Sequence, residues 1–123
     1  MINQQILRDR TKYFAIEIYR FLKNLSLSYE DRVIAGQLLR SSSSVASNYR
    51  AACRSRSGGE FYSKICIVLE EADETLFWLE IIIEADIARN DNTEELKEKA
   101  TEFVKIFSSM RKTLKDNKSG RFN

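Results

Sequence analysis

The chain of 123 residues contains no histidine and no proline, and it has only four glycines and two cysteines. Without histidine it lacks the side chain that most often acts as a general base near neutral pH and most often binds metals. Without proline, no helix interior loses a backbone donor or meets a ring that clashes with the preceding turn. These absences disfavour histidine-dependent enzymes and di-iron bundles, and they favour long helices.

Cysteines and long apolar runs are also scarce. Cys53 and Cys66 lack the spacing of a metal site, and we expect two reduced, partly buried thiols rather than a disulfide. The N-terminus has no signal-peptide pattern, and the longest apolar stretch, residues 76–88, is interrupted by three acidic residues. We therefore expect a cytoplasmic protein without a membrane-spanning segment.

Apolar residues recur at helical spacing in four segments of the chain. The connections between them are short, so consecutive helices are expected to be antiparallel neighbours. The sequence therefore predicts an all-α fold, an up-down-up-down antiparallel four-helix bundle. We expect one domain over residues 1–116, followed by a frayed polar tail at residues 117–123. The four expected helices cover about residues 4–25, 29–56, 59–89 and 93–116.

Polar residues at the expected helix starts are placed to cap them. A capping side chain accepts a hydrogen bond from an amide that the first helical turn leaves unpaired. We interpret the adjacent Gly58 and Gly59 as a helix stop. The three expected capping pairs are Ser28 with Asp31, Ser57 with Glu60, and Asn92 with Glu95.

Charge is divided unevenly along the chain. Residues 1–58 hold ten basic and four acidic residues, whereas residues 59–90 hold two basic and eight acidic ones. Residues 91–123 hold eight basic and six acidic residues. The whole-chain net charge of +2 and pI of about 8.6 are only a weak sign of a nucleic-acid partner, so the pattern is more informative than the total.

The stretch at residues 37–57 is rich in serine and arginine and contains no acidic residue. On a helical wheel its cations, like those of the first segment, fall opposite the apolar stripe. Guanidinium groups and serine hydroxyls on such a face would meet phosphate oxygens. The predicted nucleic-acid-binding residues are Arg8, Lys12, Lys23, Arg40, Arg50, Arg54 and Arg56.

Other interpretations of this basic face stay open. A charged face opposite a core stripe is often only solvated. The second segment also has the charge to pair with the acidic third segment, in its own chain or in a neighbour. Ser43, Ser44 and Ser47 are small enough to mark tight packing between subunits.

The third segment is apolar on more than one side, although a helix in a monomeric bundle needs only one apolar face. Exposed apolar patches with aromatic anchors mark contact sites. We therefore predict a homo-oligomer, with a wide bundle core that absorbs these side chains as the alternative. The predicted oligomer interface contains Phe77, Trp78, Ile81 and Ile82.

We expect no enzymatic activity, no cofactor and no metal. The sequence has no nucleophile with an evident base, no glycine-rich phosphate loop before a helix, and no Cys-x-x-Cys pair. The carboxylates of the third segment are dense, but a metal site would need ligands that converge from other helices.

The middle of the chain resembles the 23S rRNA intervening-sequence protein family. The family's second helix carries Gln-x-x-Arg, then Ser four residues on and Asn four further, which correspond here to Gln37, Arg40, Ser44 and Asn48. We call these four positions the family signature. The match extends over about residues 30–85.

Further matches and departures accompany the signature. Glu60 and Phe61 match the Glu-Phe that opens the family's third helix, and Glu74 matches a glutamate deeper in it. Many members have proline where this chain has Ala46, and many continue Ile-Ala-Glu-Gly where this chain has residues 49–52, Tyr-Arg-Ala-Ala. The missing glutamate makes this face more basic than is usual in the family.

The resemblance implies a four-helix bundle that forms a ring-like homopentamer. The chain is also similar to the accessory proteins of diversity-generating retroelements, which bind nucleic acid and a reverse transcriptase through basic surfaces. Our leading hypothesis is a non-enzymatic oligomeric bundle that binds RNA or other nucleic acid through the basic face of its first two helices. The alternative is an interaction scaffold whose basic face docks an acidic protein partner or a neighbouring subunit.

Overall fold

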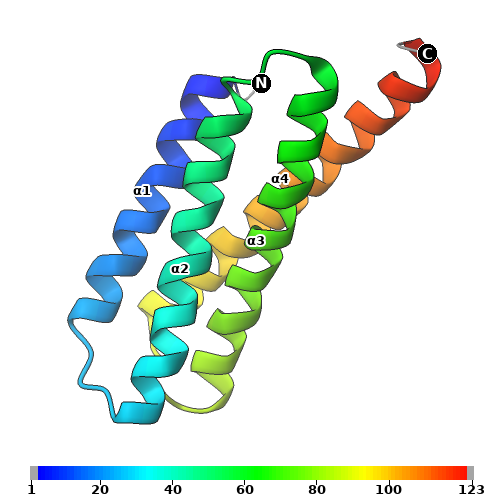
Figure 1. The fold of residues 1–123 in the computed structure, drawn as a ribbon. Coiled ribbons are helices and arrows are strands. Elements are labelled where there is room, and N and C mark those ends of the chain that lie inside the picture. The colour runs from blue at the N-terminus through cyan, green and yellow to red at the C-terminus, as the bar shows by residue number, and fades with distance from the viewer. Residues whose placement is uncertain (1–2, 122–123) are drawn as a thin grey trace.

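The computed structural model describes residues 3–121 and shows four helices joined by three short connections (Figure 1). Each helix runs antiparallel to the one before it and packs on it. The predicted all-α four-helix bundle is confirmed, and no strand occurs within residues 3–121. The helices are α1 (Gln4–Lys23), α2 (Tyr29–Ala52), α3 (Gly58–Glu84) and α4 (Asp91–Arg121).

Two of the three predicted N-caps are confirmed. The Ser28 hydroxyl accepts from the Asp31 amide at 3.1 Å, and the Ser57 hydroxyl accepts from the Glu60 amide at 3.1 Å. The prediction for α4 is wrong by two residues, because the side-chain Oδ1 of Asn90 accepts from the Thr93 amide at 3.0 Å. Asn90 also accepts from the Thr93 hydroxyl, which is buried and needs that partner.

The interpretation of Gly58 and Gly59 as a helix stop is wrong. Both lie in the first turn of α3, and neither has a positive φ. Among residues 3–121, the non-glycine residue with a left-handed backbone is instead Asp86, with φ 56°, just after α3. The amide of Ile87 donates to the Ile82 carbonyl and that of Asp86 to the Ile83 carbonyl, a Schellman arrangement that ends the helix.

α4 continues to Arg121, five residues beyond the end expected for it. Most of the predicted tail therefore lies within this helix, and residues 122–123 fall outside the described residues. In Figure 1 the C-terminal half of α4 leans away from α1 and extends past the start of α3.

The core is formed by the apolar stripes that the helical period predicts. Phe14 of α1 meets Phe103 of α4 edge-on at 5.4 Å between ring centroids, and Tyr49 of α2 meets Phe107 of α4 at 5.4 Å. Ser41 of α2 and Thr75 of α3 are fully buried and hydrogen-bonded to each other at 3.0 Å, which lets these two helices approach closely. Thr75 also donates to its own helix, so the buried hydroxyl pair is satisfied.

Outside the core, Cys53 and Cys66 are both free and partly buried. Over the stretch that the structure describes, no helix combines the length and the apolar character needed to cross a membrane.

Candidate nucleic-acid interface

A groove of about 540 Å³ runs between the N-terminal half of α1 and the C-terminal half of α2. Its rims carry Arg8 and Lys12 on α1, Arg50 near the end of α2, and Arg54 in the turn just after α2. Arg8 and Lys12 are four residues apart, so both project from the same face of α1. The antiparallel packing of the two helices brings the pairs together. We call this feature the α1–α2 groove.

Small side chains make the groove hollow. Ala15 on α1 and Ser43, Ala46 and Ser47 on α2 line it between the cations. Ser43 and Ser47 are exposed, whereas Ser41 and Ser42 are the serines buried in the helix packing. The serine run is therefore divided, with one pair packing inside the bundle and another offering hydroxyls to the groove.

The cations of the groove are available to a ligand. Within the described residues, Arg50, Arg54 and Lys12 take part in no ion pair, and Arg8 donates to the neutral Gln5 side chain at 2.5 Å. The one carboxylate among the lining residues is that of Asp9, which accepts from Gln5 at 2.9 Å. Four cations therefore face one anion across a solvent-filled groove.

Arg40 differs from the other predicted nucleic-acid-binding residues, because it is ion-paired within the bundle. Its guanidinium lies 2.6 Å from Glu74 and 3.3 Å from Glu71, both on α3 of the same chain. Its side chain is still 49% exposed, so its contact with phosphate stays a prediction. Of the pairings that the sequence left open, Arg40 pairs with acidic α3, whereas Arg50 and Arg54 face solvent.

The two remaining predicted cations lie outside the groove. Lys23 is at the far end of α1, with its Nζ 5.8 Å from the centre of the Tyr19 ring. Arg56 is exposed in the connection between α2 and α3. Four of the seven predicted residues are thus brought together, and Arg56 lies at the same end of the bundle as those four.

The family signature follows the seam between α2 and α3. Arg40 donates to Gln37 at 3.5 Å as well as to the α3 carboxylates, and Asn48 donates to the Ser44 carbonyl at 2.9 Å. All four members therefore hold one another, and Arg40 also holds α3. In this chain the signature residues therefore stabilise the packing of α2 against α3.

The two carboxyl groups at this seam have opposite pKa shifts. Hydrogen bonding to Arg40 and then to Glu71 lowers the pKa of Glu74. Burial, followed by a hydrogen bond to Glu74, raises the pKa of Glu71 in spite of the nearby guanidinium. Glu74 also accepts from the Trp78 indole at 3.4 Å, which ties the polar seam to the aromatic pair of α3.

The predicted oligomer interface is only partly exposed. Phe77 is 49% exposed and stacks edge-on with Trp78 at 4.9 Å between ring centroids, whereas Trp78 and Ile81 are half-buried. Ile82 is a correction, because it is 0% exposed and belongs to the core of its own bundle. It points inward because α3 is covered by both α2 and α4, which a single helical period does not reveal.

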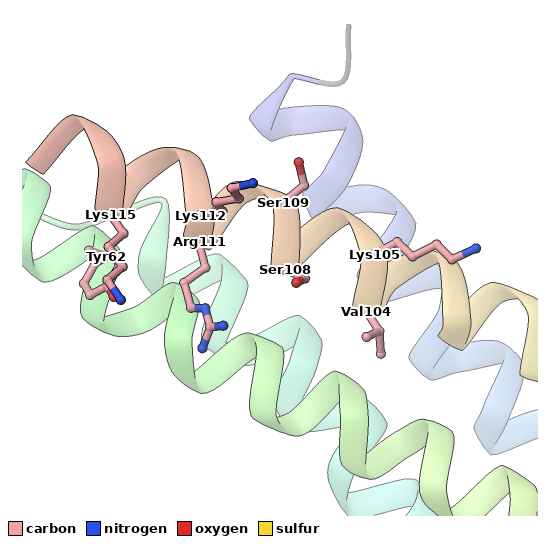
Figure 2. Close-up of a pocket in the computed structure, with 8 residues that line it drawn as sticks. All are labelled: Tyr62, Val104, Lys105, Ser108, Ser109, Arg111, Lys112 and Lys115. Carbon is pink, nitrogen blue, oxygen red and sulfur yellow. The ribbon is translucent and has the colours of Figure 1, made fainter.

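Sequence reasoning missed a second basic hollow, of about 640 Å³, between α3 and α4 (Figure 2). It extends from Val104 to Lys115 of α4, mainly on the C-terminal half of that helix, and includes Tyr62 of α3. The net charge summed over residues 91–123 does not reveal this hollow, because the acidic N-terminal half of α4 offsets the basic C-terminal half. We call it the α3–α4 hollow, and its cations are Lys105, Arg111, Lys112 and Lys115.

Both basic features lie at one end of the bundle, together with the first turn of α1 and the α2–α3 connection (Figure 1). This basic end comprises residues 3–13, 41–70 and 105–117, with eleven basic and four acidic residues. The acidic end comprises residues 14–40 and 71–104, with seven basic and fourteen acidic residues. Net charges of +7 and −7 thus lie at opposite ends.

The clustered carboxylates do not assemble into a metal site among the described residues, where no three His, Cys, Asp or Glu side chains are grouped closely enough to hold an ion.

Comparison with known proteins adds the following. The family model described as 23S rRNA-intervening sequence protein matches residues 3–109. A solved structure, that of a protein of unknown function from the S23 ribosomal protein family of Bacteroides thetaiotaomicron, is 32% identical. The match covers 85% of this chain and 97% of that one, with a TM-score of 0.77. Comparison with curated proteins gives no match.

Proposed function

The chain belongs to the 23S rRNA-intervening sequence protein family, and from that premise we propose that it is a non-enzymatic bundle that binds RNA through the α1–α2 groove. The observation that carries the proposal is the convergence of four cations, from α1, the end of α2 and the turn after α2, on one groove with a single carboxylate. Guanidinium groups bind phosphate oxygens through paired hydrogen bonds, and the hydroxyls of Ser43 and Ser47 add further donors.

The geometry favours a phosphate backbone over a small anion. Arg8 and Lys12 are one helical turn apart on α1, and Arg50 and Arg54 line the other side from the end of α2 and the turn after it, so the cations form a row on each side of the groove. Rows of charge match the repeated charges of a nucleic-acid strand. Contacts of this kind position the strand without reading its bases, so we expect little sequence specificity from the groove.

Filter binding of a labelled RNA hairpin at low salt tests the proposal. The variant Arg50→Ala/Arg54→Ala removes two phosphate contacts, and we expect it to weaken binding by about tenfold or more. The matched control is Arg20→Ala/Arg32→Ala, which removes two exposed arginines that lie at the acidic end and form no ion pair with any described residue. We expect the control to bind as the parent does. Absence of binding by the parent at low salt, or unchanged binding by the Arg50/Arg54 variant, would contradict the proposal.

We further propose that the protein acts as a homo-oligomer, in which several grooves bind one RNA together. Phe77, half-exposed beside Trp78, offers the aromatic anchor of a contact between subunits. Linked grooves raise the overall affinity without any new contact, because binding of the first groove concentrates the RNA near the others. The family resemblance sets the expected number of subunits at five.

A second candidate function is docking of an acidic protein on the same groove. The acidic end of the bundle, with its net charge of −7, would offer such a surface on a second copy of the chain. If the resemblance to retroelement accessory proteins extends to function, the partner would be a reverse transcriptase. A purified partner that stays bound after nuclease treatment, and that competes with RNA for the groove, would favour this candidate.

A further inference from the structure

The α3–α4 hollow is a second cluster of cations built on different helices from the α1–α2 groove. Figure 2 shows Arg111 reaching from α4 toward α3 and Lys115 close to Tyr62, whereas Lys105 and Lys112 extend outward from α4. No carboxylate is among the residues that line this hollow. Within the described part of the chain, none of its four cations takes part in an ion pair.

The spacing of these cations fits a chain of phosphates. Lys105 and Lys115 are ten residues apart on one helix, which corresponds to about 15 Å at 1.5 Å per residue. A single small anion would contact only part of that length, whereas successive phosphates of a strand would meet all of it. Ser108 and Ser109 add hydroxyl donors between the cations.

The position of the hollow links it to the groove. Both lie at the basic end, on opposite flanks of the bundle, and Arg56 is exposed in the α2–α3 connection between them. The distance across the end is roughly 20 Å, because neighbouring helices pack about 10 Å apart. A strand that leaves one flank therefore needs only several nucleotides to reach the other.

We propose that the α3–α4 hollow is a second contact surface for the same RNA, which crosses the basic end of the bundle and touches both flanks. This inference rests on the proposed function and extends it from one groove to the whole end. The RNA is expected to turn around the α2–α3 connection, so that the acidic end faces away from it. The −7 charge there keeps the strand from binding elsewhere along the helices.

The test compares four proteins in the filter-binding assay with the same labelled RNA hairpin. They are the parent, Arg50→Ala/Arg54→Ala in the groove, Arg111→Ala/Lys115→Ala in the hollow, and the quadruple variant. We expect each double variant to lose about tenfold in affinity, and the quadruple variant to lose the product of the two losses. The Arg20→Ala/Arg32→Ala control should bind like the parent, and the melting temperature of every variant shows whether it folds.

The outcomes separate this inference from the proposed function. A loss confined to the Arg50/Arg54 variant keeps the groove and overturns the second contact. Unchanged affinity in both double variants overturns both. Two RNA molecules bound per subunit, one of them lost with each pair, would also contradict the inference, because each flank would then bind its own strand. Retention of anionic lipid vesicles that depends on Arg111 and Lys115, with RNA binding unaffected, would assign the hollow to a membrane surface and overturn it.

Discussion

Arginines of α2 and of the turn after it differ in what they contact. Arg40 is held by Glu71 and Glu74 of α3, while Arg50 and Arg54 form no ion pair with any described residue. The difference arises from the packing of α3, which places Glu71 and Glu74 beside the middle of α2. A charge at the α2–α3 seam therefore stabilises the bundle, and a charge at the end of α2 is left for a ligand.

The seam gives a pH-dependent prediction for the Arg40→Gln variant. The lowered pKa of Glu74 adds stability above the unfolded pKa, and this stability is lost as pH falls through the folded value. The raised pKa of Glu71 acts in the opposite sense, adding stability at low pH that is lost as pH rises. Arg40 favours the charged form of both groups, so its removal should lower the melting temperature at neutral pH by a few degrees.

The difference between parent and variant should shrink as pH falls below the usual pKa of glutamate, first as Glu71 and then as Glu74 takes up a proton. Circular dichroism melts across this range measure it. Arg32→Gln, which alters an exposed arginine without a carboxylate partner among the described residues, is the control and should leave the melting temperature unchanged. An equal difference between Arg40→Gln and the parent at all pH values would show that the ion pair does not cause it.

At the residue scale the sequence indicates which cations leave the core but not what lies opposite them. The wheel places Arg40 and Arg50 on the same side of α2, because the helical period reports only the direction from one axis. Whether a carboxylate stands nearby depends on the packing of α3. For the same reason Ile82 was assigned to an outer face although it lies in the core.

At the scale of the helices, the two halves of α4 differ in the sign of their charge. Its N-terminal half holds most of its acidic residues, and its C-terminal half holds three of the four cations of the α3–α4 hollow. The net charges of the two halves nearly cancel when they are summed over residues 91–123. The total charge of the segment therefore does not reveal the second basic cluster. A count by half-helix, combined with the antiparallel order, would have revealed it from the sequence.

The start of α4 provides a prediction about capping. Asn90→Ala removes the acceptor for the Thr93 amide and the Thr93 hydroxyl, and it should cost about 1 kcal/mol of unfolding free energy. Asn92→Ala changes an exposed side chain within the helix and should leave stability within about 0.5 kcal/mol of the parent. Urea denaturation measures both.

A larger loss of unfolding free energy for Asn92→Ala than for Asn90→Ala would contradict this prediction and favour Asn92 as the cap. The sequence placed it there because the Asn92–Glu95 spacing matches a capping box, and the competing Asn90 lacks a glutamate three residues on. The caps at Ser28 and Ser57 were predictable because no rival polar residue is better placed in the turns before them.

At the scale of the whole molecule, the surface proposed to bind RNA and the surface proposed to contact other subunits lie in different places. The basic end is the proposed RNA contact, and Phe77 lies on α3 beside residues of the acidic end. Binding of RNA and contact between subunits can therefore take place together, as the combined binding of several grooves requires. The sequence established the bundle through its helical period, but the convergence of charge at one end depends on the antiparallel order of all four helices.

The oligomer leads to a prediction about mass in solution. At micromolar concentration we expect light scattering to give a multiple of the chain mass of 14.3 kDa, and Phe77→Asp to reduce it toward the monomer. Ile6→Asp places the same charge on an exposed apolar position of α1 and should leave the mass unchanged. A monomeric parent at this concentration would contradict the role proposed for Phe77.

The salt dependence of RNA affinity tests the central claim most directly. Phosphate contacts release counterions, so the logarithm of affinity should fall linearly with the logarithm of salt concentration, by roughly 0.7–0.9 per contact. For Arg50→Ala/Arg54→Ala the slope should become shallower by about 1.4–1.8, and for Arg20→Ala/Arg32→Ala it should equal that of the parent. Equal slopes for the parent and the Arg50/Arg54 variant would show that the α1–α2 groove does not contact the phosphates.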